Sequence, residues 1–201
     1  MRTETNLKTL LKIASGMTLA GLVACGGGGG GSSSSTGGGT TGPSATKLVY
    51  TNPSPSAGQW GLMKNAASTD SHLILDLMPP SDAVSGFGVG ITLTTTGGVT
   101  WSKVASGDAT YIENVAYTLG SGTQLIQGTP KASSLIAGVY QKGLATTPIA
   151  HSAGAVARIA LDLKTGTSPS SSVTLAVNMS KELQASGLQA ITVVPGTISL
   201  Q

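Results

Sequence analysis

Short runs of alternating residues constrain the fold of this chain more than any other feature. In each run apolar side chains take every second position, and clusters of Gly, Ser, Pro and Asn separate one run from the next. The clearest runs are residues 72–78, 87–93, 155–163, 173–179 and 191–194. A period of two places the apolar side chains on one face of a β-strand. The pattern therefore predicts antiparallel sheets, each with one face turned toward a core.

Further, less regular runs raise the predicted number of strands to about nine or ten, which is typical of a β-sandwich or barrel. These runs are residues 48–51, 99–104, 115–119, 124–126 and 135–140, with a last strand at 198–200 after a Pro195-Gly196 turn. One short helix is expected at 181–186, because Ser180 can cap it and Gly187 can end it. Strands do not alternate with helices, which argues against a doubly wound α/β fold.

The N-terminus has the plan of an export signal. Arg2, Lys8 and Lys12 precede an apolar stretch at residues 13–24, which is too short to span a bilayer as a stop-transfer helix. The stretch ends in Leu22, Val23, Ala24 and Cys25, and these four residues resemble the lipobox of bacterial lipoproteins. An ordinary signal peptide with a chance cysteine is the alternative.

The lipobox resemblance implies that residues 1–24 are removed and that Cys25 carries acyl chains. Such chains hold a soluble body to a membrane. Gly26 follows the cysteine, whereas the family's inner-membrane members commonly have Asp there, so the resemblance favours the outer membrane. We therefore expect an exported, lipid-anchored protein of the cell envelope, whose body faces either the periplasm or the medium.

Composition divides the rest of the chain in two. Residues 25–46 comprise Cys25 and an almost pure Gly, Ser and Thr tract with no apolar periodicity, which predicts a flexible linker. Residues 47–201 contain all the alternating runs and are predicted to form one β-sandwich domain. Because Cys25 is the only cysteine, no disulfide is expected in this domain.

Four stretches of residues 47–201 resemble the cohesin domain, a nine-stranded jelly-roll sandwich. They are 84–93, which contains the pair Gly86-Phe87, then 99–104, 154–164 and 191–200 with its Pro195-Gly196 turn. The resemblance implies a cohesin-like sandwich, related to some carbohydrate-binding modules, and a protein-binding role. The family's usual Tyr-Asp pair is replaced by Thr94, Thr95 and Thr96, so the resemblance does not extend to dockerin recognition. An immunoglobulin-like sandwich is the alternative architecture.

Charge excludes one class of partner. Charged residues make up only 9% of the chain, and residues 1–25 carry a net charge of +2 from three basic side chains and one acidic one. The remainder holds 8 basic and 7 acidic residues with no basic cluster. This distribution argues against nucleic-acid binding, which requires a basic patch or stripe.

Catalytic chemistry has little support in the sequence. His72 and His151 lie beside Asp70, Ser71 and Ser152, but neighbours on an extended chain point to opposite faces. A hydrolase is therefore less favoured, although a serine brought to His72 by the fold stays possible. No cofactor or metal is predicted, because the chain has two histidines and no EF-hand spacing. One structural Ca²⁺ remains open.

Asp76 and Asp162 are the candidate pair of carboxylates for glycoside hydrolysis. Asp76 and Asp162 have similar leucine neighbours, and a glycosidase would use them as acid and base. The favoured interpretation places both on the outward faces of their strands, because the leucines occupy the core.

Two features offer binding surfaces. Gly86, Gly88, Gly90 and Thr92 alternate with apolar residues, which predicts a flat strand face that either lies under residues 52–66 or accepts a partner's backbone. Trp60 lies between glycines and is the expected exposed aromatic for stacking on a sugar. The favoured function is a lipid-anchored, non-catalytic protein-binding or assembly module of the envelope; the alternative is a carbohydrate-binding module whose partner is a polysaccharide.

Overall fold

The computed structural model describes residues 42–81, 85–117, 124–141, 147–150 and 154–201. The predicted signal, Cys25 and the start of the linker lie outside these residues, as do His151 and Ser152. Within the described residues, regular secondary structure consists of strands, and no helix could cross a bilayer. The prediction of an all-β sandwich is confirmed.

One layer of the sandwich is a five-stranded sheet in the order β11-β10-β4-β8-β7. Its strands are β11 (Gly187–Ala190), β10 (Thr174–Gln184), β4 (Gly88–Thr96), β8 (Ser134–Gln141) and β7 (Gln124–Lys131). All four neighbouring pairs are antiparallel, as the alternation predicted. Strand β4 lies at the centre of this sheet.

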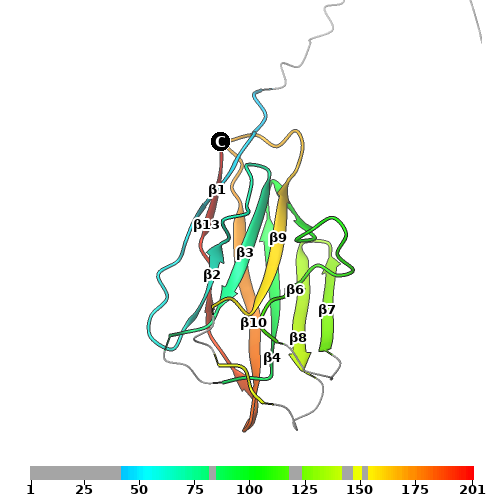
Figure 1. Ribbon diagram of the computed structural model, residues 1–201. Helices are drawn as coiled ribbons and strands as arrows, with labels where there is room; N and C mark the ends of the chain where they lie inside the picture. The colour runs from blue at the N-terminus through cyan, green and yellow to red at the C-terminus, as the bar shows by residue number, and fades with distance from the viewer. Residues whose placement is uncertain (1–41, 82–84, 118–123, 142–146, 151–153) are drawn as a thin grey trace, which may run out of the picture. The chain divides into compact units, whose positions relative to one another are not determined.

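The other layer is a six-stranded sheet in the order β12-β2-β3-β9-β5, with β6 also paired to β9. Its strands are β12 (Val193–Val194), β2 (Trp60–Lys64), β3 (His72–Met78), β9 (Ala157–Leu163), β5 (Val99–Ser102) and β6 (Glu113–Asn114). Only β12 and β2 run parallel among the pairs described. A separate pair joins β1 (Leu48–Thr51) to β13 (Thr197–Leu200). Figure 1 shows β3 and β9 in front of β10 and β4, with β8 and β7 to the right.

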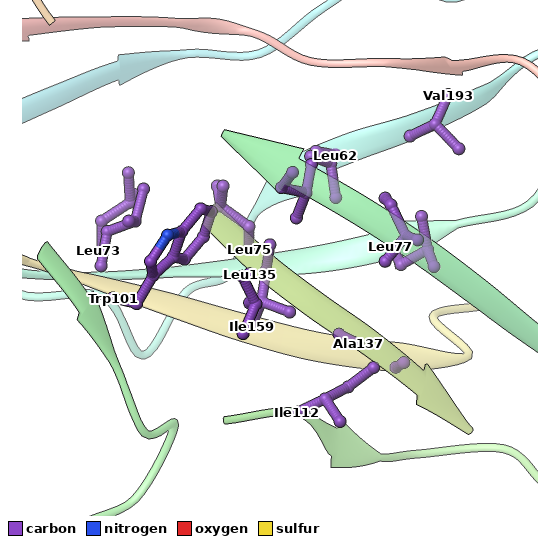
Figure 2. Packing of buried hydrophobic residues seen from close by; sticks show 14 of the residues in the cluster. Leu62, Leu73, Leu75, Leu77, Trp101, Ile112, Leu135, Ala137, Ile159 and Val193 are labelled. Carbon is purple, nitrogen blue, oxygen red and sulfur yellow. The ribbon is translucent and has the colours of Figure 1, made fainter. Parts of the chain in front are cut away.

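The core lies between the two sheets. Leu73, Leu75 and Leu77 of β3 point inward and are 3% exposed or less. Leu135 and Ala137 of β8 are also buried in this cluster, and Figure 2 shows side chains of the two strands packed together. Each inward-facing position follows the period of two in its strand. Burial of these leucines stabilises the sandwich by about 1.5–3 kcal/mol each.

The predicted helix at residues 181–186 is wrong. Strand β10 continues to Gln184, a turn follows at residues 185–186, and Gly187, with a φ of 108°, is the first residue of β11. Ser180 does not cap a helix, because its hydroxyl donates to the Ile191 carbonyl at 2.6 Å. Pairing with β4 on one side and β11 on the other satisfies the backbone here, and it overrides the local capping pattern.

Three other predicted segments differ in detail. Residues 115–117 form no strand, and the short strand β6 precedes them; 118 and 119 lie outside the described residues. Strand β2 was not predicted, because residues 52–66 have no clear alternation. The last turn at Pro195 does not close a hairpin, because β12 pairs with β2 while β13 pairs with β1.

Candidate functional site

The outer face of the five-stranded sheet carries most of the predicted binding strand. Val89, Ile91 and Leu93 of β4 are buried in the core, so the intervening Gly88, Gly90, Thr92 and Thr94 point outward. The register of β8 places Tyr140 opposite Gly88, Gly138 opposite Gly90, and Ile136 opposite Thr92. We call this surface the β4 face; it also includes the outward residues Leu125, Met179, Lys181 and Leu188 of the flanking strands.

Glycines on the β4 face form a seat for the ring of Tyr140. A Cβ atom placed on Gly88, Gly90 or Gly138 would meet the Tyr140 side chain. The ring therefore lies over three glycines of two adjacent strands, and desolvation raises the pKa of its hydroxyl. The predicted flat face exists, but Tyr140 covers part of it. Residues 52–66 do not, because β2 belongs to the opposite sheet.

Gly86 does not lie on the β4 face. Its backbone pairs with Ile149 in an isolated bridge, and a Cβ there would collide with the carboxyl group of Glu182. Glu182 is 1% exposed and opposes Val89, so it points into the sandwich. The alternation of the sequence therefore fails at Gly86, because the chain bends at Phe87 before β4 begins.

Exposed apolar side chains surround the seat of Tyr140. Ile136 and Met179 are each 48% exposed, Leu188 is 53% exposed and Leu125 is 57% exposed. Ile136, Met179 and Leu188 help to line a shallow hollow of about 230 Å³ on this face. Four large hydrophobic side chains from four strands are thus left in water on one surface, which is a recognised mark of an interaction site.

The β4 face carries little charge. Lys181 and Lys131 point outward from it, whereas no acidic side chain does so among its described residues. The carboxylates of Asp76, Glu113 and Asp162 belong to the opposite sheet. A partner for the β4 face would therefore meet apolar groups, hydroxyls and two lysines.

Met179 lies on the β4 face because of a β-bulge in β10 that the sequence alternation does not predict. Simple alternation would group Met179 with the inward Leu175 and Val177. The register between β10 and β4 shifts between Val177 and Met179, so Met179 opposes Thr92 on the outer face. The exposure of Ile136 could have been predicted from the sequence. Its neighbours Leu135 and Ala137 are also apolar, and they point to the face opposite Ile136, so burying them leaves Ile136 on the outer face.

The outer face of the six-stranded sheet contains ion pairs. Arg158 Nε donates to Asp76 Oδ1 at 2.8 Å, and its Nη1 lies 3.5 Å from Glu113 Oε1. Asn65 Nδ2 donates to both oxygens of Asp76. The hydrogen bond and negative charge of Asp76, together with Glu113, raise the pKa of Arg158. The four side chains bond to one another, so the cluster braces β3, β9 and β6.

A second pair on that face joins His72 to Asp162. The two residues are directly opposed in the register of β3 and β9, and His72 Nδ1 lies 2.5 Å from Asp162 Oδ1. The other ring nitrogen, Nε2, lies 3.1 Å from the carbonyl oxygen of Val104. In a Ser-His-Asp triad that nitrogen must receive the serine proton. Here it faces a backbone carbonyl, although Ser102 and Ser106 lie nearby around the same hollow.

Asp76 and Asp162 do point outward, as the favoured interpretation held. Both lie on the outer face, since their neighbours Leu75, Leu77 and Leu161 are buried. Asp162 is opposite His72 in the register of β3 and β9, and His72 lies four residues before Asp76 in β3. Four residues of strand span about 13 Å. A glycosidase pair is about 5–9.5 Å apart, so this spacing does not suit that reaction.

The prediction that Trp60 is an exposed sugar-stacking residue is wrong. Trp60 is 1% exposed, because it begins β2 and its side chain belongs to the core. Trp101 is buried as well, and its ring nitrogen donates to the Ser133 carbonyl at 3.0 Å. All seven aromatic residues lie in the described part of the chain, and only Tyr111 and Tyr140 are more than slightly exposed.

Within the described residues, no group of three or more His, Cys, Asp or Glu side chains could hold a metal ion. Calcium prefers six to eight oxygen ligands. The acidic residues on the outer face of the six-stranded sheet are instead paired with Arg158 and His72.

Comparison with solved structures identifies cohesin modules with this fold. The second type II cohesin module from the cellulosomal adaptor ScaA scaffoldin of Acetivibrio cellulolyticus superposes with a TM-score of 0.51 at 12% identity, covering 77% of this chain and 96% of that one. The sixth cohesin from scaffoldin B of the same organism gives a TM-score of 0.47 at 11% identity, over 70% of this chain and 97% of that one.

A non-cellulosomal cohesin from Archaeoglobus fulgidus gives a TM-score of 0.39 at 9% identity, over 77% and 90% of the two chains. No family model matches the sequence, and no match was found among curated proteins. The likeness to the ScaA module shows that the described part of the chain has a cohesin-like β-sandwich fold.

Proposed function

We propose that the β-sandwich is a non-catalytic protein-binding module that holds its partner on the β4 face. The observation that carries this proposal is the group of four exposed apolar side chains, Leu125, Ile136, Met179 and Leu188, on the outer surface of one sheet. Removing such side chains from water on docking contributes about 25 cal/mol per Å² of apolar area. A sheet face rather than an enclosed cavity suits a protein surface.

The composition of the β4 face sets the character of the interaction. Apolar side chains surround Tyr140, whose ring lies over three glycines, and an aromatic side chain with two rotatable bonds costs little entropy to order. With only Lys131 and Lys181 for charge, electrostatic steering contributes little. The affinity for the partner should therefore depend only weakly on salt.

The shared fold supports an assembly role. The ScaA module comes from a cellulosomal adaptor scaffoldin. The contacts of His72 support the non-catalytic part of the proposal, because the nitrogen needed for base catalysis faces the Val104 carbonyl.

The same proposal includes an anchor. The lipobox-like residues Leu22 to Cys25 support export and acylation, and Gly26 supports the outer membrane. The Gly, Ser and Thr tract that follows would let the sandwich turn relative to the lipid surface. A protein built in this way would display the β4 face to another component of the envelope or its surroundings.

Site-directed photo-crosslinking in native cells tests this function. A photoreactive residue at position 179 should capture one dominant protein, whereas the same residue at position 100, which is exposed on the opposite sheet, should not. The captured protein is then purified and its affinity for the full chain is measured by calorimetry. Binding confined to position 100, or equal capture at both positions, contradicts the proposal.

Charged substitutions on the β4 face provide the quantitative test. Met179→Glu and Ile136→Glu should each weaken binding at least tenfold without loss of stability, because both side chains are about half exposed. Thr100→Glu is the matched control and should bind normally. Gly88 is unsuitable for this purpose, because any side chain there collides with backbone atoms of β8.

A further inference from the structure

A second hollow lies on the outer face of the six-stranded sheet, away from the β4 face. Its volume is about 540 Å³, within the range of about 300–1,000 Å³ that is usual for small-ligand sites. Side chains from three strands and from the chain after β5 line it: His72, Ser102, Lys103, Ser106, Tyr111 and Asp162. The hollow therefore combines a carboxylate, hydroxyls, an ammonium group and an aromatic ring.

The carboxylate in this hollow is held in place before any ligand arrives. His72 fixes one oxygen of Asp162 at 2.5 Å, and the Val104 carbonyl fixes the other end of the imidazole at 3.1 Å. Asp162 is nevertheless 42% exposed, so it can still accept hydrogen bonds. Pre-ordered acceptors raise affinity, because less conformational entropy is lost when the ligand binds.

The chemistry of the hollow selects among ligand classes. An anion would meet the negative charge of Asp162, and an apolar ligand would cover Lys103, the serine hydroxyls and the second oxygen of Asp162 without bonding to them. A neutral polyhydroxylated ligand satisfies all of them, since its hydroxyls both donate to the carboxylate and accept from Lys103, Ser102 or Ser106. Tyr111 adds apolar area with a polar tip.

We propose that this hollow binds a neutral hexose unit of a polysaccharide. The site does not use Trp60, the aromatic that the sequence suggested for a sugar, and it does not depend on the β4 face. Because the two sites lie on opposite sheets, the sandwich could hold a protein and a glycan together.

Titration calorimetry on the full chain tests the proposal, with cellotetraose, tetra-N-acetylchitotetraose and mannotetraose as probes. At least one probe should bind with a Kd at or below the millimolar range. Asp162→Asn should weaken that binding about tenfold or more, which is the effect of losing one charge-assisted hydrogen bond. Tyr140→Leu, on the β4 face, is the control and should leave sugar binding unchanged.

A blocking variant keeps the test independent of the His72 pair. Ser106 is exposed, so Ser106→Trp should fill the hollow and abolish binding while the melting temperature stays the same. Absence of binding by all three probes at millimolar concentration overturns the proposal. Binding that survives both Ser106→Trp and Asp162→Asn overturns it as well. Neither result bears on protein capture by the β4 face.

Discussion

At the scale of single residues, Tyr50 connects parts of the chain that the sequence keeps far apart. Its hydroxyl donates to the Leu62 carbonyl at 2.7 Å and accepts from the Gly196 amide at 2.6 Å. The side chain is buried, and this burial raises the pKa of its hydroxyl to about 12. One phenol thus joins β1, β2 and the turn between β12 and β13.

Tyr50→Phe should destabilise the sandwich by about 1–3 kcal/mol, because it leaves the Leu62 carbonyl and the Gly196 amide without their partner. Urea denaturation followed by tryptophan fluorescence measures the change. Stability equal to that of the wild type would show that the two backbone groups find other partners.

Tyr50 also makes the free energy of unfolding depend on pH in the alkaline range. Below pH 10, the ordinary tyrosine value, the hydroxyl is protonated in both states and its contribution is complete. Between pH 10 and about 12 the unfolded chain ionises first, so stability falls by up to about 3 kcal/mol. The decline should be smaller in Tyr50→Phe. Burial also raises the pKa values of Tyr117 and Tyr140, so the difference between the two proteins isolates Tyr50.

At the scale of elements, the close approach of β4 and β8 depends on glycine. A Cβ on Gly88 would lie 2.6 Å from both the Val139 carbonyl oxygen and the Tyr140 Cα, which are backbone atoms fixed by the ladder. At Gly90 the nearest atoms instead belong to the far end of the Tyr140 side chain. The two glycines therefore differ in what must move to admit a side chain.

Gly88→Ala should cost about 1–3 kcal/mol of stability, the usual penalty of forced overpacking, and Gly90→Ala should cost less. Combining Gly90→Ala with Tyr140→Ala should remove the clash at position 90, whereas Tyr140→Ala should not rescue Gly88→Ala. Chemical denaturation of the wild type, the three single variants and the two double variants measures these differences. Equal costs at the two glycines would contradict the geometry.

At the scale of the whole molecule, the body begins before Lys47, whereas the sequence assigned all residues up to 46 to the linker. Ala45 is 8% exposed and its amide donates to the Thr167 carbonyl at 2.7 Å. The Thr46 amide donates to the Gln201 carbonyl at 2.7 Å. These two residues belong to the fold, because both amides donate to the body and the Ala45 side chain is buried in its core.

Truncation locates that boundary. A chain beginning at residue 44 should melt at the same temperature as one beginning at residue 26. A chain beginning at residue 47 should melt several degrees lower, because each kcal/mol lost shifts the melting temperature of such a domain by about 2–4 °C. Calorimetry compares the three. Identical melting of all three would place the boundary at Lys47.

The proposed anchor is tested at Cys25. Cys25→Ser should accumulate as uncleaved precursor and should no longer incorporate radioactive palmitate, because the acyl chains require the thiol. A variant with Ser32→Ala in the linker should be processed and labelled normally. Palmitate labelling of Cys25→Ser at the wild-type level would rule out this anchor.

The sequence by itself determined the class of fold and the strands with the cleanest alternation. Residues 72–78 became β3 with its leucines inward, because a period of two is a local property that burial of one face then enforces. The order of those strands also supported the cohesin-like resemblance that the fold confirms. The alternation of Gly88, Gly90 and Thr92 likewise placed them together on one face of their strand, but it wrongly included Gly86.

Only the tertiary structure decided which side chains meet. His72 and Asp162 are 90 residues apart, and the register of β3 and β9 alone brings them together. A single bulge moved Met179 outward, and the pairing of β2 with β3 and β12 buried Trp60. Registers and bulges depend on partners distant in the chain, so local patterns do not encode them. For that reason both proposed binding surfaces emerged from the packing of the sheets.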